Sequence, residues 1–529
     1  MKKIIVLFFS LLACCCISAQ NMFQKTFGAA LSETGTCIQN TPDGNYIISG
    51  YATSFSAPFR DAYLLKVDAA GNLLWSKTYG GSNDEVCYYV SVCTDGGFIL
   101  TGGTNSFGSG QNDLYLIRTD SSGTLLWSTV VGGIYDDYGW FALQTSDMGF
   151  LASGFSATCA GNCYQGLIVK TDSTGTVQWT KLFGGTGSEI FYGLDKTSDG
   201  GYIVTGYVST NSFGSSDTWL VKLNAIGDTV WTKYYGSTTE ESGAVVRQTA
   251  DGGYIIAGDI HNSFNVHHAS LLKTDSLGNL EWAKTFGAPG SSGGELGWDV
   301  HQLTDHGYIL VGSTPSFNNS TQVFVVRTDS AGSMLWSKTY GGPQPDDPWY
   351  SVPAADGGFA IIGATQSFGS GDWDIYLLKI DSSGSASGCN DSSIVPEEVN
   401  PVLQTGRGTI ITTGMLSIHP VMVTNNPATI ALNICPPVAV PEINFDKNVM
   451  FIYPNPFSSH IRIAIPGQTI RKLTIKIINT SSQTVFYKEE TCLKDGYERI
   501  IDLHSLMKGI YLLDINIDGK RRVKKIVKE

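Results

Sequence analysis

Residues 75–127 read WSKTYGGSNDEVCYYVSVCTDGGFILTGGTNSFGSGQNDLYLIRTDSSGTLLW, and this pattern recurs along the chain. Each copy is anchored by one aromatic residue, and the successive spacings are 52, 52, 52, 52, 51 and 54 residues. The anchors are Phe23, Trp75, Trp127, Trp179, Trp231, Trp282 and Trp336. A period this long, with no helical pattern inside it, predicts one four-stranded sheet per copy, which is the blade of a β-propeller.

A second residue recurs with nearly the same spacing and indicates a tight turn in each copy. It is an aspartate that opens a D-x-(G/N)-aromatic sequence: Asp43, Asp95, Asp147, Asp199, Asp251, Asp305 and Asp356. Glycine in such a turn supplies the positive φ that two-residue hairpin loops need. The turn therefore joins two strands of the same sheet.

The four expected strands of the quoted copy are Trp75–Tyr79, Val86–Cys93, Phe98–Thr101 and Leu114–Thr119. The fourth is apolar on both faces, as a strand between two neighbouring blades should be. Seven copies predict an all-β, seven-bladed propeller over residues 20–384. The anchor residues are expected to pack between blades. The Phe23 strand either completes the last blade or opens a blade of its own.

The segment Asp68-Ala69-Ala70-Gly71-Asn72-Leu73-Leu74-Trp75 has the form D-x-x-G-x-x-x-W. It resembles the tryptophan-docking repeat of quinoprotein-like propellers. The resemblance is local and implies the fold, not quinone chemistry. We expect no cofactor, since the vicinal cysteines Cys14, Cys15 and Cys16 fall in the segment discussed next.

The first residues have the features of a signal peptide, residues 1–19. Lys2-Lys3 form its basic region and Ile4 to Cys16 its apolar core. Ile17-Ser18-Ala19 resembles a cleavage site, which would make Gln20 the new N-terminus. Leu11-Leu12-Ala13-Cys14 offers the alternative of a bacterial lipobox, in which Cys14 is acylated. Both interpretations predict export.

Eleven cysteines are present, and cleavage after Ala19 would leave eight. An exported protein is able to form disulfides. Cys159 with Cys163, and Cys389 with Cys435, are the candidate pairs. Cys37, Cys87 and Cys93 are equally compatible with buried free thiols. No C-x-x-C pair follows the signal, so we expect no structural zinc site and no metal.

Charge divides the chain into two regions. The net charge is −13, but residues 447–529 carry 15 Lys+Arg against 8 Asp+Glu, and the remainder carries 19 against 39. The acidic body argues against a nucleic-acid partner. Residues 385–446 are rich in Ser, Pro, Asn and Thr and are predicted to be a linker with one small hairpin near Thr409–Thr413.

The basic region, residues 447–529, has three recognisable sequence features. It opens with Tyr453-Pro454-Asn455-Pro456-Phe457, continues through Gly509-Ile510-Tyr511, and ends with Lys524-Lys525 in KKIVK. In this order they resemble the type A C-terminal sorting domain of the type IX secretion system of Bacteroidetes. The resemblance implies a small β-sandwich that binds the secretion machinery. It also implies a cargo that is released, or attached to surface lipopolysaccharide.

No catalytic motif stands out. Gly290-Ser291-Ser292-Gly293-Gly294 matches G-x-S-x-G but lacks the strand-to-helix turn that such a nucleophile needs. His261 and His267-His268 form the densest histidine group, and no motif places a carboxylate beside them. We therefore expect no catalytic, metal or cofactor residues.

Two sets of residues remain as candidates for binding. Acidic residues follow each Gly-Gly region and would form either a cation-binding rim or ordinary turns: Glu33, Asp84, Asp136, Glu189, Glu240, Glu295 and Asp346. Four tryptophans break the repeat pattern and could stack on sugars or fill the interior: Trp140, Trp298, Trp349 and Trp373.

These features favour a non-enzymatic surface or secreted propeller that binds an unknown glycan or protein. The alternative is a carbohydrate-active enzyme with its site in the propeller channel, which the fold alone does not exclude. A quinoprotein dehydrogenase is a third hypothesis. Channel-facing carboxylates or histidines that vary between repeats would separate the enzyme from the binding protein.

Overall fold

The computed structural model describes residues 22–528, apart from short gaps. The gaps are 56–57, 110, 158–163, 262–263, 265, 290–292, 318–319, 387–389, 407–415, 419–422, 426–429, 436–450, 454–458, 467–469, 480–482, 494–495 and 519. The signal peptide, its cleavage site at Ala19 and Gln20, and the candidate disulfide Cys159–Cys163 lie outside the described residues, as does Cys389.

All regular structure in the described residues is β-strand, which confirms the all-β prediction. No helix in this part of the chain is long and apolar enough to cross a membrane. The chain divides into two compact units, Met1–Val438 and Ala439–Glu529.

The first unit contains seven antiparallel sheets within the described residues, numbered here 1 to 7. Sheet 1 has β2 (Glu33–Asn40), β3 (Tyr46–Ala52), β4 (Asp61–Val67) and β5 (Leu73–Gly80). Sheet 2 has β6 (Glu85–Val92), β7 (Phe98–Thr104), β8 (Asp113–Thr119) and β9 (Leu125–Gly132). Sheet 3 has β10 (Asp137–Gln144), β11 (Phe150–Ala157), β12 (Tyr164–Thr171) and β13 (Val177–Phe183).

Sheets 4 to 7 repeat the same order. Sheet 4 has β14 (Glu189–Lys196), β15 (Tyr202–Val208), β16 (Asp217–Leu223) and β17 (Thr229–Gly236). Sheet 5 has β18 (Glu241–Gln248), β19 (Tyr254–His261), β20 (His267–Thr274) and β21 (Leu280–Gly287). Sheet 6 has β22 (Leu296–Gln302), β23 (Tyr308–Thr314), β24 (Gln322–Thr328) and β25 (Met334–Tyr340). Sheet 7 has β26 (Asp346–Pro353), β27 (Phe359–Thr365), β28 (Asp374–Ile380) and, from the other end of the unit, β1 (Phe23–Gly28).

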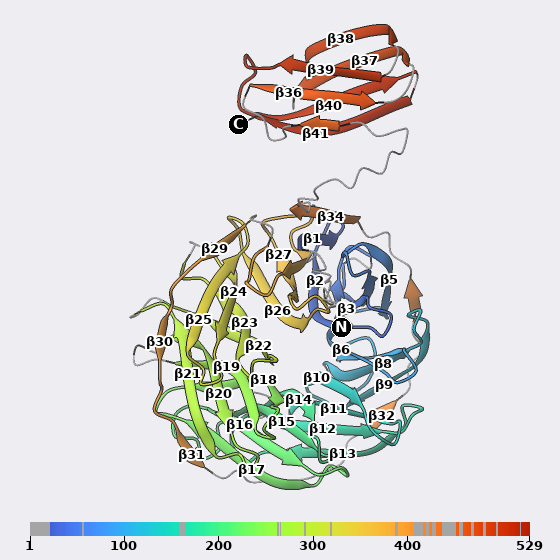
Figure 1. The fold of residues 1–529 in the computed structure, drawn as a ribbon. Helices are drawn as coiled ribbons and strands as arrows, with labels where there is room; N and C mark the ends of the chain where they lie inside the picture. Colours follow the sequence, from blue (N-terminus) through green and yellow to red (C-terminus); the bar gives the residue numbers. More distant parts are fainter. Residues whose placement is uncertain are drawn as a thin grey trace, which may run out of the picture. The chain divides into compact units, whose positions relative to one another are not determined.

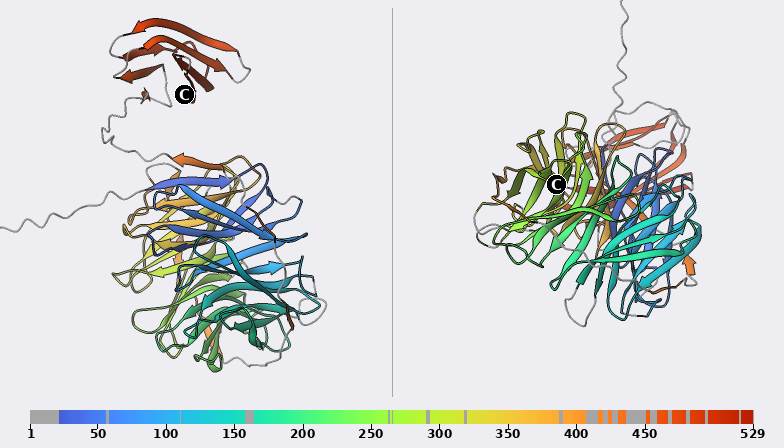
Figure 2. Two further views of the ribbon diagram at one scale, coloured as in Figure 1. Left: turned by 90° about the vertical axis from the view of Figure 1, so that its right-hand side faces the viewer. Right: turned by 90° about the horizontal axis from the view of Figure 1, so that it is seen from below.

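The N-terminal strand therefore completes the sheet of the last repeat. β1 pairs antiparallel with β28, with Phe23 opposite Lys379 and Phe27 opposite Ile375. The first strands of the sheets contact one another in an unbroken cycle from β2 through β6, β10, β14, β18, β22 and β26 back to β2. Figure 1 shows these sheets arranged around a common centre, and Figure 2 shows the same sheets from the side and from below.

The segment predicted as a linker, residues 385–446, instead supplies edge strands to the sheets. These are β29 (Asp391–Ser393), β30 (Glu397–Val399), β31 (Gln404–Gly406), β32 (Leu416–Ile418), β33 (Val423–Asn425) and β34 (Ile430–Cys435). They pair in turn with β25, β21, β17, β9, β5 and β1. These six strands thus follow the outer edges in the order opposite to the repeats, and they cover strand edges that would otherwise be open to other chains. The segment has no long apolar run, so its composition did not indicate that it forms edge strands.

The aromatic anchors lie on the fourth strand of each sheet and contact the next sheet. The Trp75 ring centroid is 6.3 Å from that of Phe98, and the Trp127 centroid is 5.4 Å from that of Phe150. Glycine makes room for the ring: a Cβ at Gly227, whose φ is +78°, would lie 2.3 Å from Trp179.

The turn aspartate is half of a recurring ion pair. In every sheet the turn aspartate pairs with a Lys or Arg on the third strand, as in Lys66–Asp43 at 2.6 Å and Lys222–Asp199 at 2.9 Å. The other pairs are Arg118–Asp95, Lys170–Asp147, Lys273–Asp251, Arg327–Asp305 and Lys379–Asp356. The cation stem is buried and the carboxylate lies mostly at the surface, so the pair holds the turn against the sheet.

The second unit consists of two facing sheets. One has β35 (Phe451–Tyr453), β36 (His460–Pro466) and β39 (Gly496–Asp502). The other has β38 (Thr484–Leu493), β37 (Ile470–Asn479), β40 (Gly509–Ile517) and β41 (Lys520–Lys528). Ile461, Ile475 and Ile515 belong to their common apolar core. This agrees with the predicted small sandwich.

Candidate functional site

A β-bulge in the first strand of every sheet aims one side chain toward the common centre. In β6 the register shifts between Cys87 and Tyr89, which leaves Tyr88 out of the ladder. The same shift sets apart Trp140 in β10 and Trp298 in β22. A bulge breaks the regular alternation of side chains between the two faces of a strand. The bulged residue can therefore point its side chain in a new direction, toward a site.

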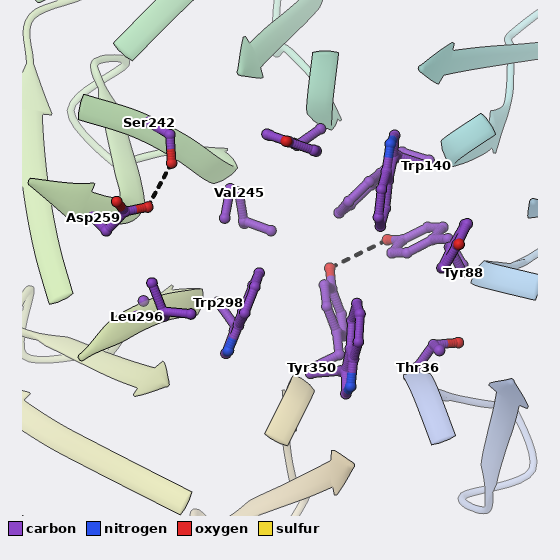
Figure 3. Close-up of a pocket in the computed structure, with 15 residues that line it drawn as sticks. Thr36, Tyr88, Trp140, Ser242, Val245, Asp259, Leu296, Trp298 and Tyr350 are labelled. Atoms are coloured by element: carbon purple, nitrogen blue, oxygen red, sulfur yellow. Dashed lines mark hydrogen bonds between the residues drawn. The ribbon is translucent and has the colours of Figure 1, made fainter. Parts of the chain in front are cut away.

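The seven bulged residues are Thr36, Tyr88, Trp140, Tyr192, Ala244, Trp298 and Trp349, and all of them line one cavity of about 280 Å³. We call this cavity the aromatic pocket. Five of its seven bulge positions are aromatic, and the other two are small. Figure 3 shows Tyr88, Trp140, Trp298 and Tyr350 facing one another across it.

The pocket walls are built from stacked rings. Tyr88 and Trp140 stack with centroids 4.2 Å apart, and Trp298 and Trp349 stack at 5.5 Å. Tyr192 meets Trp140 edge to face at 5.3 Å. Offset and edge-to-face pairs are the preferred aromatic geometries, so the walls are rigid. The Nε1 atom of Trp140 is buried and has no hydrogen-bond partner among the described residues.

A polar network lies beneath the rings. Tyr350 accepts a hydrogen bond from Arg247 Nη2 at 2.6 Å, and the guanidinium lies 5.4 Å from the Tyr350 ring centre. Arg247 Nη2 also pairs with Asp299 Oδ1 at 2.8 Å. The Oδ2 atom of Asp299 accepts from Ser351 Oγ at 2.8 Å and lies 3.0 Å from His301 Nε2.

Charge compensation keeps Asp299 ionised in this network. Its side chain is fully buried, and burial alone would raise its pKa; Arg247 and His301 nevertheless hold the pKa well below the usual range. Burial raises the pKa of Tyr88, Tyr89 and Tyr192, so these phenols stay neutral. The aromatic pocket therefore has neutral walls over one compensated ion pair.

The sequence left a cation-binding rim and ordinary turns as alternatives for the acidic residues, and the structure favours turns. The acidic residue that opens each first strand is buried: Glu33, Glu85, Asp137, Glu189, Glu241, Glu295 and Asp346. In three sheets this residue is one position after the one predicted, since Asp84, Asp136 and Glu240 precede it. Glu85 Oε2 accepts from Gly81 N at 2.7 Å, and Asp137 Oδ2 from Gly133 N at 2.7 Å. These carboxylates are turn-formers, which was the second of the two interpretations.

Burial also shifts their protonation. It raises the pKa of Asp137 to about 7, with Asp113 nearby adding to the rise. It raises the pKa of Asp217, which faces Glu241, to about 6.

The four pattern-breaking tryptophans separate into two groups. Trp140, Trp298 and Trp349 line the aromatic pocket. Trp373 does not; its backbone oxygen accepts from Glu33 N at 2.8 Å in the loop before β28. Tyr88 and Tyr192 were missed because they look like ordinary strand aromatics. Their position could have identified them, because each lies three residues after the acidic residue at the start of its strand.

The histidine group gains the carboxylate that no motif indicated. Asp259 and His261 lie on one face of β19, and His267 is directly opposite His261 on β20. Asp259 Oδ2 is 2.7 Å from His267 Nδ1, and this hydrogen bond raises the pKa of His267. His268 is buried separately. The Gly290–Ser292 part of the G-x-S-x-G match lies outside the described residues.

Three described cysteines, Cys37, Cys87 and Cys93, are buried free thiols. Burial raises the pKa of Cys93 to about 11. They are therefore packing residues, which is one of the two interpretations left open by the sequence.

The predicted sorting-signal residues all belong to the second unit. Tyr453 ends β35, Gly509-Ile510-Tyr511 begin β40, and Lys524-Lys525 lie in β41. Tyr511 is buried and donates a hydrogen bond to the Met507 carbonyl at 2.8 Å. Pro454, Asn455, Pro456 and Phe457 lie outside the described residues.

A family model described as the secretion system C-terminal sorting domain matches residues 451–529. This confirms the sorting-domain prediction for that part of the chain. A type IX sorting domain marks a protein that is secreted or displayed at the cell surface, and it implies interaction with the secretion machinery. The localisation of this protein is therefore the cell exterior.

Solved structures show only weak likeness. Sqt1 from Chaetomium thermophilum is 8% identical with a TM-score of 0.36, covering 69% of this chain and 99% of that one. A protein of unknown function from Dyadobacter fermentans is 10% identical with a TM-score of 0.34, covering 67% and 97%. The comparison with curated proteins gave no match.

Proposed function

We propose that this protein is a seven-bladed β-propeller, exported by the type IX system, that captures a saccharide in its aromatic pocket. Sheets 1 to 7 are the blades, and β1 closes the ring by completing sheet 7. The cyclic contact of the first strands supports this arrangement. Release from the cell or attachment to surface lipopolysaccharide follows from the sorting unit.

The observation that carries the proposal is the convergence of five aromatic bulge residues on one cavity. Ligand pockets are typically apolar and aromatic with a few placed polar groups. Flat ring faces suit the apolar face of a sugar, and Ser242 and Asp259, which also line the pocket, suit its hydroxyls. A nucleic-acid ligand does not suit the acidic body.

A glycan array with the full mature chain tests this proposal. Specific binding should be weakened by Trp140→Ala and by Trp298→Ala. Trp373→Ala is the matched control, because that indole lies outside the pocket and should leave binding unchanged. Binding that survives both pocket substitutions, or no binding to any glycan, would contradict saccharide capture.

A second candidate is a carbohydrate-active enzyme. It is favoured by Asp259, which lines the aromatic pocket and belongs, with His261 and His267, to a group that has no counterpart among the described residues of the other sheets. The distinguishing result is product formation: an enzyme would generate new reducing ends from a bound glycan, and Asp259→Asn would abolish this while leaving the ring stacking intact.

A further inference from the structure

The end of the β19–β20 hairpin brings together three side chains of the types that bind transition metals. Asp259, His261 and His267 each place one donor atom within 4.8 Å of the others. The strand register explains why these three side chains lie close together. Asp259 and His261 are two residues apart on one strand face, and His267 is the cross-strand partner of His261. Directly opposed residues have Cβ atoms only about 5 Å apart.

The donor separations fit a single ion. Two ligands bonded to one zinc ion at about 2.0–2.2 Å are at most about 4.2 Å apart. His261 Nε2 is 3.0 Å from His267 Nδ1 and 4.0 Å from Asp259 Oδ2, and His267 Nδ1 is 2.7 Å from Asp259 Oδ2. All three separations meet this limit.

Neighbouring groups support the three donors. Ser242 Oγ donates to Asp259 Oδ1 at 2.5 Å, which fixes the carboxylate and leaves Oδ2 on the side of the histidines. Hydrogen-bonded carboxylates of this kind are typical around metal ligands. Glu240 Oε2 lies 3.8 Å from His261 Nε2, outside the group of three donors. His261 is buried, whereas His267 is 44% exposed, so the site is open to solvent on one side.

The site belongs to sheet 5 alone. The residues that match Asp259 in the other sheets are Tyr51, Gly103, Phe155, Tyr207, Ser313 and Ala364. None of these is a metal ligand of the usual kind. A structural need of the repeat would recur in the repeat, so this departure points to a local function.

We propose that Asp259, His261 and His267 form a binding site for a divalent transition metal ion, with Zn²⁺ as the best fit to two imidazoles and a carboxylate. The sequence had predicted no metal. The site opens into a cavity of about 330 Å³ that shares Tyr192, Ser242 and Asp259 with the aromatic pocket. A bound ion there would present an open coordination position to a ligand's hydroxyl or carboxylate groups.

The test is metal binding by the full mature chain, purified without a histidine tag and stripped with EDTA. Zinc titration by calorimetry and elemental analysis after gel filtration should give one Zn²⁺ per chain. Bound Co²⁺ should show the intense visible bands of a four-coordinate site. His267→Ala and Asp259→Asn should each weaken zinc binding at least about tenfold, the scale of losses caused even by supporting residues.

The matched control is His306→Asn, which removes an exposed histidine from a turn where φ is +65° and asparagine is tolerated. It should bind zinc as the wild type does. His267→Gln, on a half-exposed strand end, serves if the other variants unfold. Absence of stoichiometric zinc, or equal zinc in wild type and in folded His267 variants, would overturn the proposal and leave a histidine–carboxylate ion pair. These readouts need no glycan, so they stand apart from the test of saccharide capture.

Discussion

The repeated and the unrepeated positions of the sheets differ in what they do. The fourth strand of every sheet carries an aromatic anchor that contacts the next sheet, and the turn between the first and second strands carries an aspartate that pairs with a cation of the same sheet. The bulge in the first strand recurs in position but not in residue: it holds Thr36, Ala244 or one of five aromatics. The residue types that recur in every sheet stabilise the fold. The bulge position, where the residue type differs from sheet to sheet, forms the aromatic pocket.

Removing the unrepeated C-terminal unit should have the largest effect. Deletion of residues 447–529 should abolish surface delivery, because the sorting domain lies there, and should leave the first unit folded. Fractionation and protease accessibility of whole cells measure this. Surface levels equal to those of the full chain would contradict the assignment.

An anchor substitution should cost stability rather than binding. Trp179→Ala should destabilise the first unit by roughly 3 kcal/mol, since a large inter-sheet contact is lost. The Trp179 ring packs against Gly227 and under Lys181 Nζ, which is 4.7 Å from its centre. Denaturant unfolding of the purified chain gives the value, and an unchanged midpoint would refute the inter-sheet role.

A substitution in the aromatic pocket should weaken ligand binding rather than stability. Trp140→Ala should weaken ligand binding by about 2 kcal/mol, roughly thirtyfold, as for a buried aromatic contact at a binding centre. Its loss should alter folding less than the loss of an anchor, because the ring lines a cavity. Calorimetry with a ligand found on the array measures the change, with Trp373→Ala as the control.

The buried acids predict a pH effect of known sign. The pKa of Asp137 is raised to about 7 in the folded protein, whereas an unfolded Asp titrates near about 3.9. Wild type should therefore lose stability as pH rises from about 4 to about 7. Asp137→Asn should be the more stable protein at pH 7, on the order of 2 kcal/mol, and the difference should vanish near pH 4. Melting curves across this range check it; a difference independent of pH would contradict the shift.

The turn ion pairs should give the smallest effect and the opposite sign. Thr197 and Lys222 lower the pKa of Asp199 to about 2. Its contribution is therefore present above about pH 4 and is lost as pH falls toward 2. Asp199→Asn should cost less than about 1 kcal/mol at pH 7, since the carboxylate is exposed. Unfolding at pH 7 and at pH 2.5 compares the two states.

Much of the all-β architecture could be predicted from the sequence, because a period near 52 residues and a turn signal in each copy determine where strands begin and end. The edge strands of residues 391–435 could not, since three-residue pairings depend on the sheets they join rather than on their own composition. Trp140, Trp298 and Trp349 were predictable as departures from the repeat. The proximity of Asp259 and His267 could not be predicted, because it depends on how β19 and β20 pair, and the sequence does not determine that register.

The central claim is that anchor and pocket tryptophans have different roles, and parallel melting curves of Trp179→Ala and Trp298→Ala test it without any ligand. The account predicts that Trp179→Ala melts at least about 5 °C lower than wild type, and that Trp298→Ala stays within about 2 °C. Equal losses in the two variants would show that the pocket rings are core packing, and would contradict the functional assignment of the aromatic pocket.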